Sequence, residues 1–129
     1  MDVNTRFLII SDTHGEPFSN ISQRHADVAI HCGDLTKEPK LEEFQVVPKL
    51  LKENNTPLKL IMAGDHDFTM DIPAFKENHR WQSEKFYGGY GGPWELFEDS
   101  RAQGVIFLDE GVHRLNLQNG ALLTVCASP

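Results

Sequence analysis

Three short, mostly apolar segments, each followed at once by acidic or histidine residues, constrain the fold of this chain most strongly. The segments are Phe7–Ile10, Asp27–Cys32 and Leu58–Met62. Continuous apolar runs of about four to eight residues are typical of strands buried on both faces of a parallel sheet. The polar clusters that follow them would then lie together at the carboxyl edge of that sheet, where ligands bind in open α/β folds.

The segment between the second and third of these strands predicts a helical crossover. Apolar residues recur there at steps of three, three and four, the spacing of an amphipathic helix over residues 38–55: Leu41, Phe44, Val47 and Leu51. Pro48 is expected to kink or split this helix, because proline cannot donate a backbone hydrogen bond. A strand–helix–strand connection of this length predicts parallel strands joined by a right-handed crossover.

The second half of the chain predicts two more helices, one more strand and a hairpin. The boundaries expected from caps, prolines and glycines are a helix from Asp71 to about Trp81, a helix over Pro93–Gln103, a strand over Val105–Leu108, and hairpin strands over Val112–Leu117 and Ala121–Cys126. Asn119-Gly120 is a strong hairpin-turn signal. The 129 residues fit one domain, 1–129, of the α/β class, with mixed sheets flanked by helices.

Composition excludes some partners. The formal net charge is −7, and no basic stripe is present to neutralise a nucleic-acid backbone. No apolar run is long enough to predict a membrane span, and the first residues lack a signal-peptide pattern. Cys32 and Cys126 suggest neither a disulfide framework nor a zinc-finger spacing. We therefore expect a cytoplasmic protein that acts on a small molecule, with no nucleic-acid or membrane partner.

The clusters after the three strands have the composition of a metal site. The first cluster offers Asp12 and His14, the second Asp34, and the third Asp65, His66 and Asp67. Carboxylates with an imidazole suit Mn, Fe or Zn. Two such ions, about 3.5–4 Å apart, could clamp the attacking and leaving oxygens of a phosphoryl transfer. Asp34 is the natural bridge between two ions, His66 could donate a proton, and Asp67 could orient its ring.

These clusters resemble the motifs of calcineurin-like metallophosphoesterases. Asp12-Thr13-His14 is similar to the D-x-H motif, Gly33-Asp34 to G-D, and Gly64-Asp65-His66-Asp67 to G-N-H-[DE]. The intervening segments resemble the small fungal and animal branch of that family, and the resemblance covers essentially the whole chain. It implies an incomplete, shortened version of the family's two-sheet sandwich.

The resemblance also implies a role for each residue. Asp12 and His14 would bind a first divalent ion, Asp34 would bridge two ions, and Asp65 would take the place of a second-metal ligand. His66 would be the catalytic histidine, with Asp67 as its partner. The implied reaction is hydrolysis of a small phosphate mono- or diester by a metal-bound hydroxide, with His66 protonating the departing oxygen.

Two departures from the family pattern leave alternatives open. Asp65 replaces a neutral asparagine, and the later G-H and G-H-x-H motifs, which supply further ligands, are absent. Four histidines lie outside any such motif: His25, His31, His79 and His113. We expect His31 to be buried rather than a ligand. The alternatives are a remodelled metalloenzyme with non-phosphate chemistry and a non-catalytic binding or scaffold protein.

The last strand of the predicted hairpin favours self-association. Residues Ala121–Cys126 carry no charge that would protect an exposed strand edge. Two-fold pairing is the commonest way in which such edges are covered by a second copy. We therefore expect a homodimer.

Overall fold

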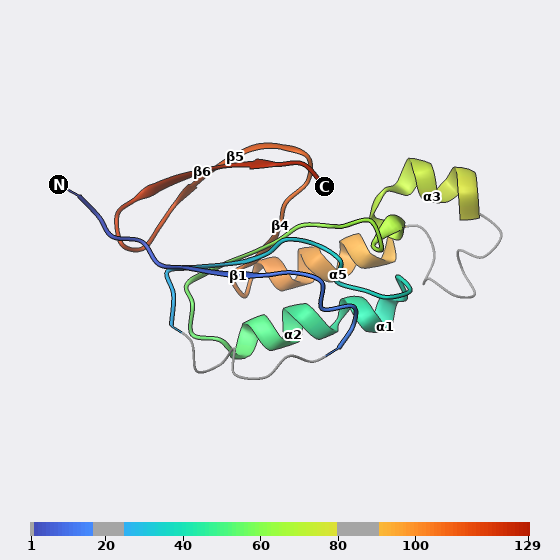
Figure 1. Cartoon of the computed structure of the whole chain (residues 1–129), viewed down its shortest axis with the longest axis horizontal. Coiled ribbons are helices and arrows are strands. Elements are labelled where there is room, and N and C mark those ends of the chain that lie inside the picture. The colour runs from blue at the N-terminus through green and yellow to red at the C-terminus, as the bar shows by residue number, and fades with distance from the viewer. Residues whose placement is uncertain (1, 17–24, 80–90) are drawn as a thin grey trace.

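The structure, a computed structural model, describes residues 2–16, 25–79 and 91–129, and its centre is a parallel sheet (Figure 1). Four strands form this sheet in the order β1 (Phe7–Ile10), β2 (Val28–His31), β3 (Leu58–Ile61) and β4 (Val105–Phe107). All three neighbouring pairs are parallel. The predicted strands and their parallel arrangement are confirmed, and the chain is an α/β protein. Burial on both faces was wrong for β1, an edge strand whose Phe7 and Ile9 are 44% and 65% exposed.

Helices cover one face of the sheet. They are α1 (Leu41–Phe44), α2 (Val46–Glu53) and α5 (Gly92–Arg101), and Figure 1 shows them on the side of the sheet opposite the hairpin. Phe44, Val47 and Phe97 enter a core with Ala29 and other sheet residues. Burial of these apolar side chains, rather than the propensity of such short helices, stabilises the helices.

The predicted crossover helix is split, as expected, but the break lies before Pro48. Helix α1 ends at Phe44 and α2 begins at Val46, so that Pro48 occupies the first turn of α2. A proline ring excludes the carbonyl group four residues earlier, which here belongs to Phe44, and its missing N–H would have had no partner in a first turn. The break therefore falls one turn ahead of the proline that causes it.

A β-hairpin covers the other face of the sheet. Strands β5 (Gly111–Asn116) and β6 (Leu122–Ala127) pair antiparallel, and Gly120 at their turn has a φ of 91°, which confirms the predicted hairpin. Inward residues of the hairpin pack against Val28 and Leu60 of the parallel sheet. Two sheets thus face one another, while the complete metallophosphoesterase sandwich remains a prediction.

The remaining elements lie beyond the carboxyl end of β3. A 3₁₀ turn, η1 (Phe68–Met70), precedes α3 (Ile72–His79), which agrees with the predicted start near Asp71. The predicted end near Trp81 lies outside the described residues. No helix in the described ranges combines the length and apolar character needed to cross a membrane.

Candidate metal centre

The loops that follow β1 and β2 run side by side and are joined by backbone hydrogen bonds. The N–H of Asp12 donates to the Gly33 carbonyl at 3.0 Å, and the N–H of His14 donates to the Asp34 carbonyl at 3.0 Å. A third bond of 2.7 Å joins the Gly15 N–H to the Leu35 carbonyl. The first and second polar clusters are therefore held in contact by the main chain.

The loop after β3 lies against the second loop because two glycines allow the backbones to approach. A Cβ atom on Gly64 would lie 2.3 Å from Oδ1 of Asp34, and one on Gly33 would lie 2.9 Å from the Gly64 Cα. Neither distance is compatible with a real side chain. Gly33 also has a φ of 111°, which L-residues rarely adopt.

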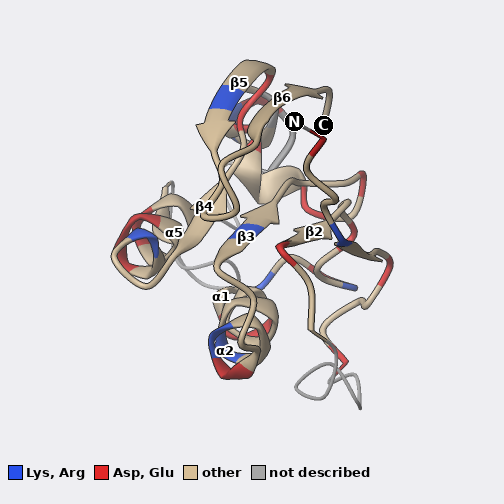
Figure 2. Cartoon of the chain, turned by 90° about the vertical axis from the view of Figure 1, so that its left-hand side faces the viewer, with Lys and Arg blue, Asp and Glu red and all other residues tan. Residues whose placement is uncertain are grey.

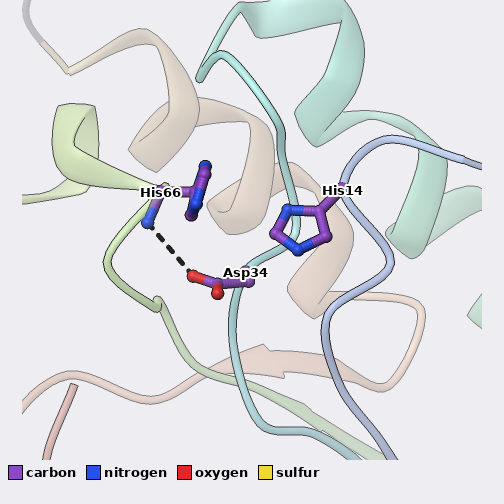
Figure 3. Close-up of side chains that lie close together, drawn as sticks. All are labelled: His14, Asp34 and His66. Atoms are coloured by element: carbon purple, nitrogen blue, oxygen red, sulfur yellow. Dashed lines mark hydrogen bonds between the residues drawn. The ribbon is translucent and has the colours of Figure 1, made fainter.

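Side chains from all three loops converge on one point. Ligand atoms of His14, Asp34 and His66 all lie within 4.8 Å of one another (Figure 3). The two imidazole rings stand edge to face with centroids 4.8 Å apart, and the backbone N–H of His66 donates to Asp34 Oδ1 at 3.1 Å. The convergence expected from the strand ends is therefore present, and it brings His66 into the group.

Three residues of the predicted metal site have strained backbones. Asp12, His14 and Asp34 have φ values of 56°, 49° and 54°. Positive φ is uncommon outside glycine, although Asp and His tolerate it better than most residues. Such strain persists only where surrounding interactions hold it, and it clusters at functional sites. The loop-to-loop hydrogen bonds supply that support here.

Backbone carbonyls orient both imidazole rings of the cluster. Nδ1 of His14 lies 3.1 Å from the Thr36 carbonyl, and Nδ1 of His66 lies 3.1 Å from the Lys37 carbonyl. A carbonyl can only accept, so both Nδ1 atoms carry a proton and Nε2 is left as the ligating nitrogen. Metal-binding histidines are typically oriented in this way. The bond to the Lys37 carbonyl is also the main cause of a raised pKa at His66.

Asp12 and Asp65 lie beside this group rather than within it. Both side chains are exposed and, with Asp34, they line a pocket of about 260 Å³. The Ser11 hydroxyl donates to Asp12 and is the main cause of a lowered pKa at that carboxyl. Two of the four predicted ligands, His14 and Asp34, thus enter the close group, while the ligand roles of Asp12 and Asp65 remain predictions.

Asp67 is the most heavily bonded side chain of the site. Its residue is 1% exposed, and its two oxygens accept from four donors: the N–H groups of Leu35, Thr36 and Gly64, and the Thr36 hydroxyl, at 2.7–3.0 Å. It therefore ties the second loop to the third. The predicted role of Asp67 as the partner that orients His66 remains a prediction, while the ring of His66 bonds to the Lys37 carbonyl.

His31 is buried, as expected, and links the first loop to the second. Its Nε2 lies 2.9 Å from the Thr13 hydroxyl, and its Nδ1 accepts from the Gly33 N–H at 3.3 Å. Burial lowers the pKa of His31 from its usual 6.5 to about 4. The ring is therefore neutral near neutral pH, and since Nδ1 accepts, Nε2 carries the proton and donates to Thr13.

This neutral histidine gives a pH-dependent stability. Because the folded pKa is depressed, the unfolded chain binds the extra proton first, and stability should fall as pH drops from 6.5 towards 4. The shift corresponds to about 3 kcal/mol of unfolding free energy. Urea unfolding of metal-free protein at about pH 7 and about pH 4.5 measures it. His31→Gln, which keeps an amide donor near Thr13, should show a shallower pH slope, and equal slopes would refute the assignment.

Some features of the site carried no signal in the sequence. The carbonyls of Thr36 and Lys37 orient the two rings, yet every residue has a carbonyl, so composition cannot single them out. The link between Thr13 and His31 joins residues of two separate strand ends. One indication of a role for His31 was present in the sequence, which is that it lies two residues before the Gly33-Asp34 motif.

Comparisons with known proteins agree with the motifs. No family model matches the chain. It is 34% identical over 67 residues to metallophosphoesterase domain-containing protein 1 of Homo sapiens and of Mus musculus, which covers 52% of this chain and 20% of each relative. It is 31% identical over 87 residues to the UPF0046 protein K07C11.7 of Caenorhabditis elegans, covering 67% of this chain and 29% of the relative.

The matched region thus spans between a fifth and a third of the length of these curated relatives. The identities are modest and cover only part of each relative, while the structure brings His14, Asp34 and His66 together. The similarities therefore support a relationship between this chain and the metallophosphoesterase family.

Proposed function

We propose that this chain forms part of a metal-dependent phosphoesterase that hydrolyses a small phosphate mono- or diester. The observation that carries the proposal is the convergence of His14, Asp34 and His66 from three neighbouring loops. The relatives named metallophosphoesterase domain-containing protein 1 support the same class of reaction. The finer placement, in the small fungal and animal branch of the family, belongs to this proposal as well.

The donor set fits a divalent ion of the Mn, Fe or Zn type. Imidazole nitrogen with carboxylate oxygen suits these ions, and the tautomers set by the Thr36 and Lys37 carbonyls leave Nε2 available for ligation. His14 and Asp34 would hold one ion, and Asp12 and Asp65 add carboxylates in the adjoining pocket for it or for a second. When bound, such ions supply the Lewis-acid charge that polarises a phosphate.

His66 is proposed as the proton donor to the departing oxygen. Its raised pKa favours the protonated ring, and the carboxylates of Asp34, Asp67 and Asp65 add to the effect of the Lys37 carbonyl. Because Nδ1 is occupied by that carbonyl, Nε2 must either donate the proton or bind an ion. The two roles exclude one another at any moment, and mutation separates them.

Metal binding is the first expected result. Calorimetric titration with Mn²⁺ or Zn²⁺ should show saturable binding by the wild type, and Asp34→Ala should abolish it, because Asp34 supplies the carboxylate of the close group that it forms with His14 and His66. Asp99→Ala is the matched control, since Asp99 is an exposed carboxylate on α5. Absence of binding by the wild type, or equal binding by Asp34→Ala, would overturn the proposal.

A remodelled metalloenzyme with non-phosphate chemistry is the second candidate. The observation that favours it is Asp65, which stands where the resembled motif has a neutral asparagine and lines the pocket with Asp12 and Asp34. An added negative charge would strengthen cation binding and repel a phosphate. Saturable Mn²⁺ binding without hydrolysis of any phosphate mono- or diester would select this candidate.

We further propose a cytoplasmic homodimer. In the described part of the chain β6 pairs with β5 alone, and no residue of β6 is charged. Val112 and Leu122 on the hairpin are 65% and 66% exposed. Size exclusion with light scattering should give about twice the 14.6 kDa chain mass. Leu122→Lys should shift the mass towards the monomer, and a concentration-independent monomer in the wild type would refute the dimer.

A further inference from the structure

A second polar pocket lies at the amino ends of the parallel strands, at the opposite end of the sheet from the group of His14, Asp34 and His66. It has a volume of about 500 Å³ and lies where α2 ends, where α5 gives way to β4, and beside the hairpin turn. Its basic and amide lining residues are His25, Lys52, Asn54, Asn55, Lys59, Gln103 and Gln118. None of the described lining residues carries a carboxylate, in a chain whose net charge is −7.

Lys59 is the unusual member of this pocket. It lies in β3, between Ala29 of β2 and Val105 of β4, and is only 6% exposed. Figure 2 views the molecule from the left-hand side of Figure 1, and the ribbon of β3, whose sequence holds one lysine, carries a blue segment. Central strands of parallel sheets are ordinarily apolar, and a lysine there must bring its ammonium to solvent or to a partner. A lysine at this position therefore calls for a specific role.

The ammonium of Lys59 has no partner within the described ranges. Its backbone N–H donates to the Gly104 carbonyl, but no hydrogen bond or ion pair involves its side chain among the residues that the structure describes. Burial lowers its pKa, as expected for a cation without a counter-charge. Because Lys59 lines the pocket, its stem can be buried while its head group faces the pocket.

A second polar group beside this pocket is also unsatisfied. Thr56 is 3% exposed and lines the pocket, and its hydroxyl makes no hydrogen bond with any described residue. Buried hydroxyls nearly always have a partner, so an orphan one needs an explanation. Thr56 and Lys59 therefore line the same pocket, and neither side chain has a polar partner among the described residues.

The charges around the pocket favour an anion. Helices α2 and α5 end at this edge, and each C-terminus contributes roughly half a negative charge. Two lysines outweigh those two partial charges, and four amide side chains also line the pocket, of which Asn55, Gln103 and Gln118 can add further donors. An oxyanion with several acceptor oxygens can use both lysines and the amides together, whereas a carboxylate offers fewer acceptors.

We propose that this pocket binds phosphate, either as the free ion or as the head group of a phosphate monoester, through Lys59 and Lys52. The site is separate from the metal cluster, and it does not rest on the proposed phosphoesterase reaction. Asp34 and His66 lie beyond the carboxyl ends of the strands, whereas this pocket lies at their amino ends.

Titration of metal-free protein with inorganic phosphate tests the proposal. The protein is kept in a chelator at constant ionic strength, so that phosphate cannot bind through a metal ion, and amide NMR shifts are followed. We expect saturable shifts at Thr56, Lys59 and Gly104, and none from equal chloride or acetate. Ribose 5-phosphate as a second titrant separates a monoester site, which binds it at least as well, from a free-ion site, which excludes it.

Variants link the binding to the lysines. Lys59→Met keeps the stem and removes the charge, and should weaken phosphate binding by about tenfold or more. Lys49→Met is the matched control, because Lys49 is exposed on α2 and does not line the pocket. If Lys59→Met fails to fold, Lys52→Gln at an exposed position should still weaken binding. Non-saturable shifts, equal affinity in the folded lysine variants, or shifts confined to residues 64–66 would each overturn the proposal.

Discussion

Replacement of His66 by alanine is expected to lower the hydrolysis rate of a phosphate ester with a poor leaving group by about 10²–10⁴-fold, the usual contribution of a general acid. His66 has the raised pKa that a proton donor needs, and its Nε2 faces no competing protein partner, since only Nδ1 has a recorded bond among the described residues. Steady-state rates on an alkyl phosphate diester with added Mn²⁺ measure the effect.

Two controls separate proton donation from metal ligation. An activated nitrophenyl ester needs little help to expel its leaving group, so His66→Ala should lose far less activity on it if His66 is the acid. Should His66 instead hold an ion, both esters would lose activity together and calorimetry would record weaker Mn²⁺ binding. His113→Ala, on β5, is the matched histidine control and should leave both rates unchanged. Full activity of His66→Ala on the alkyl ester would refute both roles.

Asp67→Ala should lower the free energy of unfolding by about 3 kcal/mol or more, because it leaves the buried N–H groups of Leu35 and Thr36 and the half-buried N–H of Gly64 without their acceptor. Each buried donor left without a partner costs about 1–3 kcal/mol, and entry of water into the gap offsets part of the total. Urea denaturation of metal-free protein is the measurement.

The same experiment distinguishes a structural anchor from a surface carboxylate. Asp99→Ala, on the exposed side of α5, should change stability by about 0.5 kcal/mol or less. Asp67→Asn should fall between the two, since it retains one acceptor oxygen. A loss below about 1 kcal/mol for Asp67→Ala would contradict the anchoring role, because that is the value of a single ordinary hydrogen bond.

The positions of the strands were predictable because the sequence signal of each strand is local. Apolar runs that end in polar clusters identify β1, β2 and β3, and parallel pairing places all three clusters at one edge of the sheet. The meeting of His14 and Asp34 follows from that geometry alone. The hairpin was equally predictable, because Asn119-Gly120 is a turn signal contained within two residues.

The position of the helix break was predictable only in part. Pro48 indicates an interruption, but the exclusion of the Phe44 carbonyl moves the break to the preceding turn. Lys59 was not predicted to be notable at all. Its position in an otherwise apolar strand becomes meaningful only when its neighbours, Ala29 and Val105, and the pocket beyond them are known.

The sequence by itself determined which residue types gather at the site, because the carboxyl ends of parallel strands all lie at the same end of the sheet. Only the tertiary structure decided what each one does there. Asp67 and His66 are adjacent in sequence, yet one turns inward to bind the amides of another loop and the other stays exposed beside Asp34. Hydrogen bonds between loops that are distant along the chain set these orientations. Such bonds cannot be predicted from a single sequence, because they produce no regular pattern of residue types.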